Sequence, residues 1–503
     1  MTRSVWWWWW AAALAIAACS SGGSGDREAA TARSTSDAQR PTGEWPTAGH
    51  DLANSRAVPE ARISSASIGD VVPLWRAELP DAGALSTVPI VLDDTVYVAG
   101  ASGQVVAVDL ATGEQIWTSE PTGFNIGPFG VAVDTDRVYA LDGSEGVVAL
   151  DRGDGSQIWS TDVTATPTTG IDIQPIVVGD VVIVSSVPIS TQGIYTPGDR
   201  GVVYALDAAT GDVRWTFDTV EGDLWGHPEV NSGGGAWYPP AVDERRQLVY
   251  VGVANPAPFP GTPEWPNGSS RPGPNLYTNS VVALDLQTGA LRWYHQVIPH
   301  DLFDRDQVHT LIADADGDET VVSAGKSGIL VGLDADDGSV LWERPVGEHR
   351  HDDLTTLDGP TEVAPGTYGG VLTPPSHADG VVYAAVINAP ATLAPDEAAY
   401  FGAELGQRDG EVVAVDVSDG RLLWSTPVPG DPLGGTAVVG DLVVTALLDG
   451  TVVALRRDDG SIVDRFDAGG GVNGWLAVGD DRLIVPVGMS DPPALLALGL
   501  PGR

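Results

Sequence analysis

The sequence predicts an all-β protein, an eight-bladed β-propeller whose blades dock through a repeated tryptophan and whose ring is closed by N- and C-terminal strands. Three observations predict it. A motif ending in tryptophan recurs along the chain, each copy alternates apolar and polar positions with a period of two, and the first and last copies are incomplete in complementary ways. A chain of 503 residues is also too long for one ordinary core, and a repeat architecture supplies a shared one.

The repeat reads Val-x-Ala-Val/Leu-Asp, two or three residues, Thr/Asp-Gly, three residues, Trp. Copies end at Trp117, Trp159, Trp215, Trp293, Trp342 and Trp424, a degenerate copy has Asp464 at this position, and an isolated VVPLWRAEL supplies Trp75. Each copy turns through Thr-Gly or Asp-Gly between two alternating runs, which predicts a β-hairpin. Two short strands precede each copy. Four short strands at a minimum spacing of 42 residues, from Trp117 to Trp159, are typical of a propeller blade.

The two ends of the repeat region predict how the ring closes. Trp75 has a last strand without preceding strands, whereas GWLAVGDDRLIVPVG and ALLALGL near the C-terminus have preceding strands without a last one. Joining them completes an eighth blade and leaves no open sheet edge. We interpret the repeated tryptophans as core residues between neighbouring blades, with no chemical role.

The N-terminus has the pattern of an export signal. Arg3 precedes an apolar run from Val5 to Ala18, and IAAC at its end resembles a bacterial lipobox in which Cys19 becomes the lipidated first residue. Cys19 is the only cysteine, so a reactive thiol or an intermolecular disulfide are the alternatives. The expected location is extracytoplasmic, as a cell-membrane lipoprotein of a bacterium that contacts the membrane only through its lipid anchor.

Composition divides the chain into three parts. Residues 1–19 are the expected lipoprotein signal peptide, residues 20–44 a flexible tether rich in Ser, Gly, Ala and Thr, and residues 45–503 the propeller. Sixty-eight acidic residues against 26 basic ones give a formal charge of -42. Because this charge repels phosphate, no nucleic-acid partner is expected.

The repeat resembles the blade motif of quinoprotein dehydrogenases, eight-bladed propellers that hold pyrroloquinoline quinone in a central funnel. Non-catalytic lipoprotein propellers, such as the outer-membrane assembly factor, are built from similar repeats, so the repeat alone leaves both functions open. The specific part of the resemblance lies between Gly233 and Lys326.

Within that segment, the resemblance implies a cofactor and metal site. In GGGAWYPPAVDERRQLVYVGVANPAPF, Trp237 falls on the tryptophan that stacks on the quinone, and Asn255, eighteen residues later, falls on the asparagine that ligates the metal. In PHDLFDRD, Asp304 falls on the general base and Asp306 on the extra carboxylate of the lanthanide-dependent branch. Alone, each has a plainer interpretation: a core tryptophan, a turn asparagine or a solvated carboxylate.

Two further residues complete the implied cofactor site. AGKSGILVGLD places Lys326 on the cationic position that faces the quinone oxygens, and Asn388 in VVYAAVINAP resembles another cofactor-contacting asparagine. Independently of the family, Lys326 is the only lysine in the chain, which suggests a position that needs a compact ammonium.

The chemistry suits these residue types. A hard cation, Ca2+ or a lanthanide, prefers carboxylate and amide oxygens, which Asn255, Asp304 and Asp306 supply. Asp304 as general base takes the alcohol proton, and Lys326 stabilises negative charge on the quinone oxygen.

Three departures from the family are visible. Where the glutamate that completes its metal site is expected, the chain reads ISTQGIYTPGDR, with Thr196 nearest and Asp199 as a substitute. ALSTVPIV and TGFNIGPFGVAV lack the charges that clamp the quinone, and the adjacent-cysteine disulfide is absent from the sequence.

The leading functional hypothesis is an exported, quinone-dependent oxidoreductase of the alcohol or sugar dehydrogenase type, with an alcohol or sugar as substrate and an unknown electron acceptor. One alternative is a non-catalytic propeller lipoprotein that acts as a binding or assembly scaffold. Another is a degenerate dehydrogenase that has lost its cofactor.

Overall fold

The computed structural model describes residues 43–502, apart from residues 126, 144, 165–168, 192–193, 316, 399–405 and 407. The predicted signal peptide, the lipidation residue Cys19 and the tether up to residue 42 lie outside the described residues. Within the described ranges, no helix is long and apolar enough to cross a membrane.

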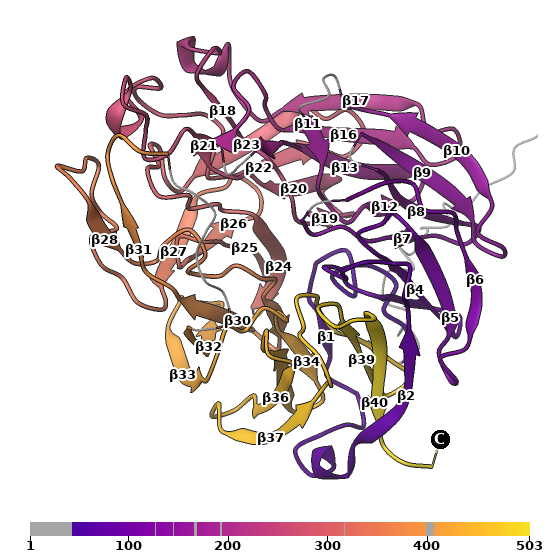
Figure 1. Cartoon of the computed structure of the whole chain (residues 1–503). Helices are drawn as coiled ribbons and strands as arrows, with labels where there is room; N and C mark the ends of the chain where they lie inside the picture. Colours follow the sequence, from indigo (N-terminus) through magenta and orange to yellow (C-terminus); the bar gives the residue numbers. More distant parts are fainter. Residues whose placement is uncertain are drawn as a thin grey trace, which may run out of the picture. The chain divides into compact units, whose positions relative to one another are not determined.

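Eight four-stranded antiparallel blades confirm the predicted propeller (Figure 1). Blade 1 is β3 (Ile90–Leu92), β4 (Thr95–Ala99), β5 (Val105–Asp109) and β6 (Gln115–Thr118), and blade 2 is β7 (Ala132–Val133), β8 (Arg137–Asp142), β9 (Gly146–Asp151) and β10 (Gln157–Asp162). Blade 3 is β12 (Ile176–Val178), β13 (Val181–Pro188), β16 (Val202–Asp207) and β17 (Val213–Asp218), and blade 4 is β19 (Ala241–Asp243), β20 (Leu248–Gly252), β22 (Ser280–Asp285) and β23 (Leu291–Gln296).

The second half of the chain continues the series. Blade 5 is β24 (His309–Ala315), β25 (Asp318–Ala324), β26 (Ile329–Asp334) and β27 (Val340–Pro345), and blade 6 is β29 (Ser376–Ala378), β30 (Val381–Asn388), β32 (Asp409–Asp416) and β33 (Leu422–Val428). Blade 7 is β34 (Ala437–Val439), β35 (Leu442–Ala446), β36 (Thr451–Arg456) and β37 (Ile462–Asp467), and blade 8 is β38 (Ala477–Gly479), β39 (Arg482–Val487), β40 (Ala494–Gly499) and β2 (Val72–Glu78).

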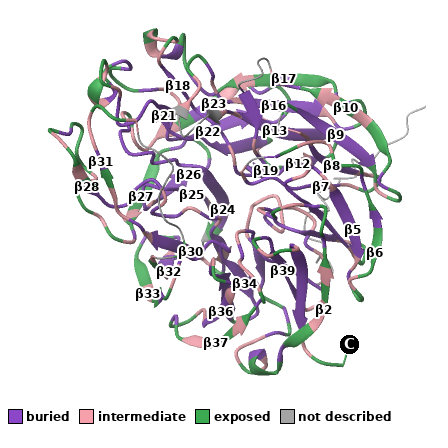
Figure 2. Cartoon of the chain, viewed as in Figure 1, coloured by how far each residue is buried: buried purple, intermediate pink, exposed green. Residues whose placement is uncertain are grey.

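Shorter elements lie in the connections around the blades. They are β1 (Ala57–Val58), β11 (Thr169–Ile171), β14 (Ser190–Thr191), β15 (Ile194–Tyr195), β18 (Ser232–Gly233), β21 (Pro256–Ala257), β28 (Thr361–Val363), β31 (Ala391–Leu393) and the 3-10 helices η1 (Ile68–Asp70), η2 (Leu224–Gly226) and η3 (Pro266–Gly268). Burial follows the order of strands within a blade: β5 is almost wholly buried, whereas β10 alternates exposed and half-buried residues (Figure 2). The blades therefore share a core on their inner strands and face solvent on their outer ones.

Strands from both ends of the chain close the ring, as predicted. β2 pairs antiparallel with β40, with Val72 opposite Gly499 and Glu78 opposite Ala494. The inner strand β38 of blade 8 contacts the inner strand β3 of blade 1. Pairing β2 inside blade 8 leaves no gap between the last blade and the first.

A repeated indole contact joins each blade to the next. The indole Nε1 donates a hydrogen bond of 2.6–3.3 Å to a backbone carbonyl of the following blade in seven pairs: Trp75 to Leu110, Trp117 to Arg152, Trp159 to Ala208, Trp215 to Leu286, Trp293 to Ala335, Trp342 to Val417 and Trp424 to Arg457. Each ring also lies against the glycine of the next hairpin turn. A Cβ on Gly338, whose φ is +74°, would stand 2.4 Å from the ring of Trp293. The motif therefore needs glycine at this position for both conformation and space.

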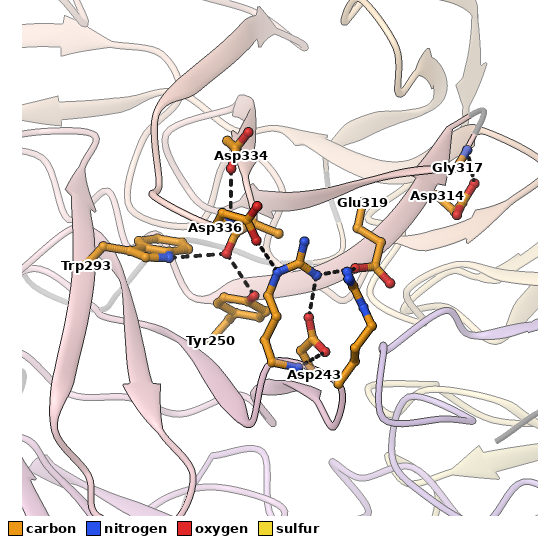
Figure 3. A network of polar contacts seen from close by, with 11 residues as sticks. Asp243, Tyr250, Trp293, Asp314, Gly317, Glu319, Asp334 and Asp336 are labelled. Atoms are coloured by element: carbon orange, nitrogen blue, oxygen red, sulfur yellow. Dashed lines mark hydrogen bonds and ion pairs between the residues drawn. The ribbon is translucent and has the colours of Figure 1, made fainter. Parts of the chain in front are cut away.

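Figure 3 shows the same contact between blades 4 and 5. Tyr250 and Trp293 both donate to the carbonyl of Ala335, at 3.1 and 3.3 Å. Beside them, Arg246 binds carboxylates from both blades, namely Asp243, Glu319 and Asp336. The indole and the arginine thus join the two blades side by side.

One blade interface differs from the others. Asp464 of β37 occupies the tryptophan position, and β37 contacts η1, which precedes β2. Here the Asp441 carboxylate accepts a hydrogen bond of 2.6 Å from the backbone N–H of Ser65. Within the described residues, polar contacts thus take the place of the indole here, beside the buried hydrophobic cluster that spans blades 7 and 8.

The segment before β2 runs along the inner strands and ties them together. Its backbone carbonyls accept hydrogen bonds from four blades: Leu52 from Val242, Ala53 from Ile312, Ser55 from His377 and Arg56 from Val438. Trp45 exchanges two backbone hydrogen bonds with Val91 of blade 1. We call residues 45–58 the N-terminal strap, because one short segment bonds to five blades.

The indole contact generates a prediction about stability. Trp293→Ala should lower the free energy of unfolding by roughly 3–5 kcal/mol, because it removes a large buried ring and leaves a cavity over Gly338. Trp293→Phe should cost less, since it keeps an aromatic ring. Asp464→Ala is the matched control and should change stability by about 0.5 kcal/mol or less. Urea unfolding followed by circular dichroism measures all three, and equal losses for Trp293→Ala and Asp464→Ala would contradict the prediction.

Candidate functional site

A cavity of about 330 Å3 lies among the loops of blades 2 to 6. Four of the residues singled out in the sequence line it: Trp237, Asn255, Asp306 and Lys326. Asp172, Tyr195 and Tyr368 line it as well. Four of the residues that the family resemblance named therefore share one cavity with three residues that it did not name.

Lys326 is the centre of the charge arrangement. Its Nζ lies 2.6 Å from Asp306 Oδ2 and 3.0 Å from Asp304 Oδ2, and only 6% of the residue is exposed. The same ammonium lies 5.4 Å from the centroid of the Trp237 ring. The single lysine of the chain is thus a buried cation between two carboxylates and beside an aromatic face.

A tight backbone contact fixes Lys326 in place. The residue lies in the turn between β25 and β26, and its N–H donates to the carbonyl of Asp306 at 2.9 Å. A Cβ on the preceding residue, Gly325, would stand 1.7 Å from that carbonyl oxygen. Glycine at this position therefore permits the lysine turn to approach the aspartate segment.

Asp301 shapes the segment that carries the two aspartates. Its carboxylate accepts hydrogen bonds from the backbone N–H groups of Phe303 at 2.8 Å and Arg305 at 2.7 Å. Asp304, between them, has a φ of +62°, which aspartate adopts more readily than most residues. The turn presents Asp304 and Asp306 to the same ammonium.

Asn255 belongs to the same site through its backbone. Its N–H donates to Asp306 Oδ1 at 2.8 Å, and its side-chain Nδ2 donates to the carbonyl of Pro256 at 3.1 Å. Both oxygens of Asp306 therefore have partners, one on Asn255 and one on Lys326. By contrast, Asp304 Oδ1 is buried and has no hydrogen-bond partner among the described residues.

The electrostatics of the cluster follow from burial and charge. Burial raises the pKa of Asp304 well above its usual value, and it raises the pKa of Asp306 too, although Lys326 opposes both shifts. Burial alone would lower the pKa of Lys326, but Asp304 and Asp306 outweigh it and leave that pKa well above the ordinary value. The lysine is therefore held as an ammonium, and the aspartates are poised to take up a proton.

Asp172 is a site residue that the sequence analysis missed. Thr196 was expected nearest the position of the family's metal-site glutamate, with Asp199 as a substitute, but neither lines the cavity, and the Thr196 hydroxyl donates to the carbonyl of Ile189. Asp172 lines it instead. Its Oδ1 is buried without a hydrogen-bond partner in the described structure, and burial raises its pKa well above the usual value. A lone aspartate between Ile171 and Ile173 was the available sequence signal.

Two predicted residues are placed differently from expectation. Asn388 does not line the cavity; its Oδ1 accepts a hydrogen bond of 2.8 Å from the backbone N–H of Glu348. Asp304 has no exposed surface and lies behind Lys326, so the cavity wall is formed by Asp306. The segment TGFNIGPFGVAV, which lacks the charged residues that clamp the quinone in the family, contributes Gly127 and Pro128 to the wall of the cavity.

The donor types in this cavity suit a hard cation. Asp172 and Asp306 place two carboxylates on the wall beside one ammonium, the buried Asp304 contacts that ammonium from outside the wall, and the Asn255 amide is an added oxygen donor. In the described part of the chain, no three His, Cys, Asp or Glu side chains are already grouped as metal ligands. The excess negative charge and the orphaned Asp172 oxygen nevertheless fit a bound cation. Trp237 and Lys326 suit a flat, anionic cofactor.

Two family models match the chain. "Glucose/ethanol/alcohol dehydrogenase, beta-propeller domain" matches residues 143–351, which include most of the cavity wall. "Outer membrane protein assembly factor BamB" matches residues 59–215 and 408–490. The second match omits the segment that carries Trp237, Asn255, Asp306 and Lys326.

Known proteins resemble the chain over most of its length. The quinohemoprotein alcohol dehydrogenase ADH IIB of Pseudomonas putida is 26% identical, over 88% of this chain and 72% of its own. The crystal structure of quinohemoprotein alcohol dehydrogenase from Comamonas testosteroni has a TM-score of 0.79 with 23% identity, covering 92% of this chain and 81% of that one. A europium-containing methanol dehydrogenase has a TM-score of 0.74 with 18% identity, covering 92% and 99%.

The fold, the segment that carries the cavity and the similar proteins all point to the same group of proteins. The eight blades match solved quinoprotein structures, and the cavity lies in the segment that the dehydrogenase model matches. The chain has the eight-bladed β-propeller fold of quinoprotein alcohol dehydrogenases and is similar to them in sequence over most of its length.

Proposed function

We propose that the chain is a pyrroloquinoline quinone-dependent oxidoreductase that oxidises an alcohol. The observation that carries this proposal is the buried cluster of Lys326 with Asp304 and Asp306 beside the Trp237 ring. Its relatives of this type include the quinohemoprotein alcohol dehydrogenase of Pseudomonas putida. A scaffold protein has no need for two buried carboxylates around one ammonium, since isolated buried charges are costly.

Each residue of the cluster has a role in the proposed reaction. Trp237 offers its face to the flat cofactor, and Lys326 places positive charge where the bound quinone becomes negative. Asp172, Asn255 and Asp306 would hold the metal ion, Ca2+ or a lanthanide. The bound quinone supplies the chemistry of accepting a hydride from the carbinol carbon.

Asp304 is the proposed general base. Its Oδ1 has no hydrogen-bond partner within the described residues, whereas both oxygens of Asp306 are engaged. A base needs a free lone pair and a pKa that is not far below the working pH, and the raised pKa of Asp304 meets the second condition. Asp304, which has no exposed surface in this structure, would therefore remove the hydroxyl proton once ligand binding uncovers it toward the cavity, while Asp306 stays bound to its partners.

A second cavity favours an alcohol over a sugar. It measures about 340 Å3 and shares Tyr195 with the first. Its wall is mainly apolar, with Val230, Phe259 and Trp265 among its residues. Such a surface suits the apolar part of an alcohol better than the hydroxyl groups of a sugar.

Export and anchoring complete the proposal. The apolar run that ends in IAAC supports lipidation at Cys19, and a tether from residue 20 to 44 would connect the lipid to the propeller. The protein would then work outside the cytoplasmic membrane of a bacterium and pass electrons to an acceptor in the same compartment.

The scaffold alternative has one observation in its favour. The assembly-factor model matches blade repeats on both sides of the site segment. A degenerate dehydrogenase would keep the same fold and lose the cofactor. Binding of quinone separates the dehydrogenase from both alternatives.

Quinone binding is the direct test of the proposed function. Purified protein titrated with pyrroloquinoline quinone, with Ca2+ or with La3+, should show a shifted quinone absorption band that depends on the metal. Asp172→Asn should weaken this metal dependence, because it removes a carboxylate from the cavity. Absence of any bound quinone under all conditions would favour a scaffold or a degenerate enzyme.

The pH dependence should distinguish the two aspartates. A base with a raised pKa is protonated and inactive below that pKa, so kcat/KM should fall as pH decreases, beginning at a higher pH than for an ordinary carboxyl. Asp304→Asn should lower kcat by roughly 10²-fold or more with quinone still bound. Asp306→Asn should chiefly weaken metal binding. If Asp306→Asn alone abolishes turnover of the loaded protein, the assignment of the base is wrong.

Lys326 should affect turnover more than substrate binding. If its ammonium stabilises charge on the reduced quinone, Lys326→Ala should lower kcat by about 10²-fold or more and change KM little. Lys326→Arg should restore part of the rate, and Lys326→Gln should not, because only the first keeps the charge. Dye-linked alcohol oxidation by quinone-loaded variants measures this. Unchanged kcat in Lys326→Ala would refute the role.

A further inference from the structure

We propose that Arg271 and Asp301 form a buried bracket that positions Asp304, Asp306 and Lys326 for proton removal. Neither residue lines the cavity, so both act through other groups. Their role in catalysis rests on the proposed function, whereas the evidence for the bracket lies in the geometry of the chain itself.

Arg271 joins the two segments that carry the site. Its Nη2 donates to the carbonyl of Pro258 at 2.9 Å and to the carbonyl of Asp301 at 2.7 Å. Pro258 follows Asn255 by three residues, and Asp301 precedes Asp304 by three. A single planar guanidinium therefore sets the spacing between the Asn255 turn and the aspartate segment.

The surroundings of Arg271 show that its position is fixed. The residue has no exposed surface, and its Nη1 donates to Asn275 Oδ1 at 2.8 Å. Among the ion pairs of the described residues, none includes Arg271. Burial lowers its pKa to about 10, a shift that the more distant Asp301 carboxylate partly opposes. A charge buried among neutral acceptors is costly to displace, because moving it would leave its donors unpaired.

Asp301 is the second half of the bracket. Besides the N–H groups of Phe303 and Arg305, its carboxylate accepts a hydrogen bond of 3.0 Å from Asn279 Nδ2. These bonds hold the turn in which Asp304 has its positive φ. Asp301 thus controls where the two aspartates lie.

The unique lysine provides a direct test. Protein labelled with 13C and 15N in lysine alone has one lysine side-chain signal, from Lys326, which reports the two carboxylates beside it. In quinone-free protein, Asp301→Asn should shift or broaden this signal, because the turn that carries Asp304 loses a hydrogen-bond acceptor. Arg271→Gln should have the same effect. In loaded protein, Arg271→Gln should lower kcat by roughly tenfold to 10²-fold with KM within about twofold.

Arg56 is a matched control elsewhere in the fold. It is 1% exposed and donates to three backbone carbonyls, those of Ala48, Thr436 and Leu476. Arg56→Gln should therefore lower the urea midpoint about as much as Arg271→Gln, but leave the Lys326 signal unchanged.

The outcomes separate the bracket from a plain packing role and from the proposed function. If Arg271→Gln and Arg56→Gln lower stability alike and neither Arg271→Gln nor Asp301→Asn alters the Lys326 signal, the bracket is refuted. Should Arg271→Gln not fold, the nearly isosteric Asp301→Asn decides alone. If wild-type protein binds no quinone, the proposed function fails, while the lysine signal still tests the bracket.

Discussion

The structure depends on one contact, an indole laid on the glycine of the next blade. It is made seven times among the described residues, and each time a hydrogen bond to a backbone carbonyl holds the ring against the next blade. Glycine is required because a side chain at a position such as Gly338 would enter the ring of Trp293. The blades therefore meet at a constant spacing, and the long loops between them are free to differ.

The ring of blades helps to offset the free-energy cost of burying a cluster of charges. Asp304, Asp306 and Lys326 lose their hydration on burial, and the loss is offset only if the partners stay within hydrogen-bond distance. Arg271 and Asp301 keep these partners close within the site, and the packed blades keep the loops that carry them in place. Neutral acceptors and backbone donors consequently hold the charged side chains at the cavity in place. These charges therefore need little rearrangement when a ligand enters.

Much of the fold could be predicted from the sequence because each repeat contains the local features that determine its structure. The alternating pattern, the turn glycine and the docking tryptophan lie close together in each copy. The incomplete copies near Trp75 and ALLALGL predict the closing blade. The site residues were predictable only between Gly233 and Lys326, where the sequence resembles the dehydrogenases. Asp172 was missed because it comes from another blade, and Asn388 was misplaced because a backbone N–H from Glu348 binds its side chain. Such contacts across loops have no local pattern in a sequence.

The closing blade has a consequence for how the chain reaches its native state. β2 lies near the beginning of the described chain and β40 near its end, so Val72 finds its partner Gly499 only when the whole chain is present. The N-terminal strap must likewise wait for blades 4 to 7. During synthesis, β2 is thus made early but paired last, and its open edge stays available to other chains. Folding should be slow, governed by the joining of distant ends, and sensitive to protein concentration until that joining is complete.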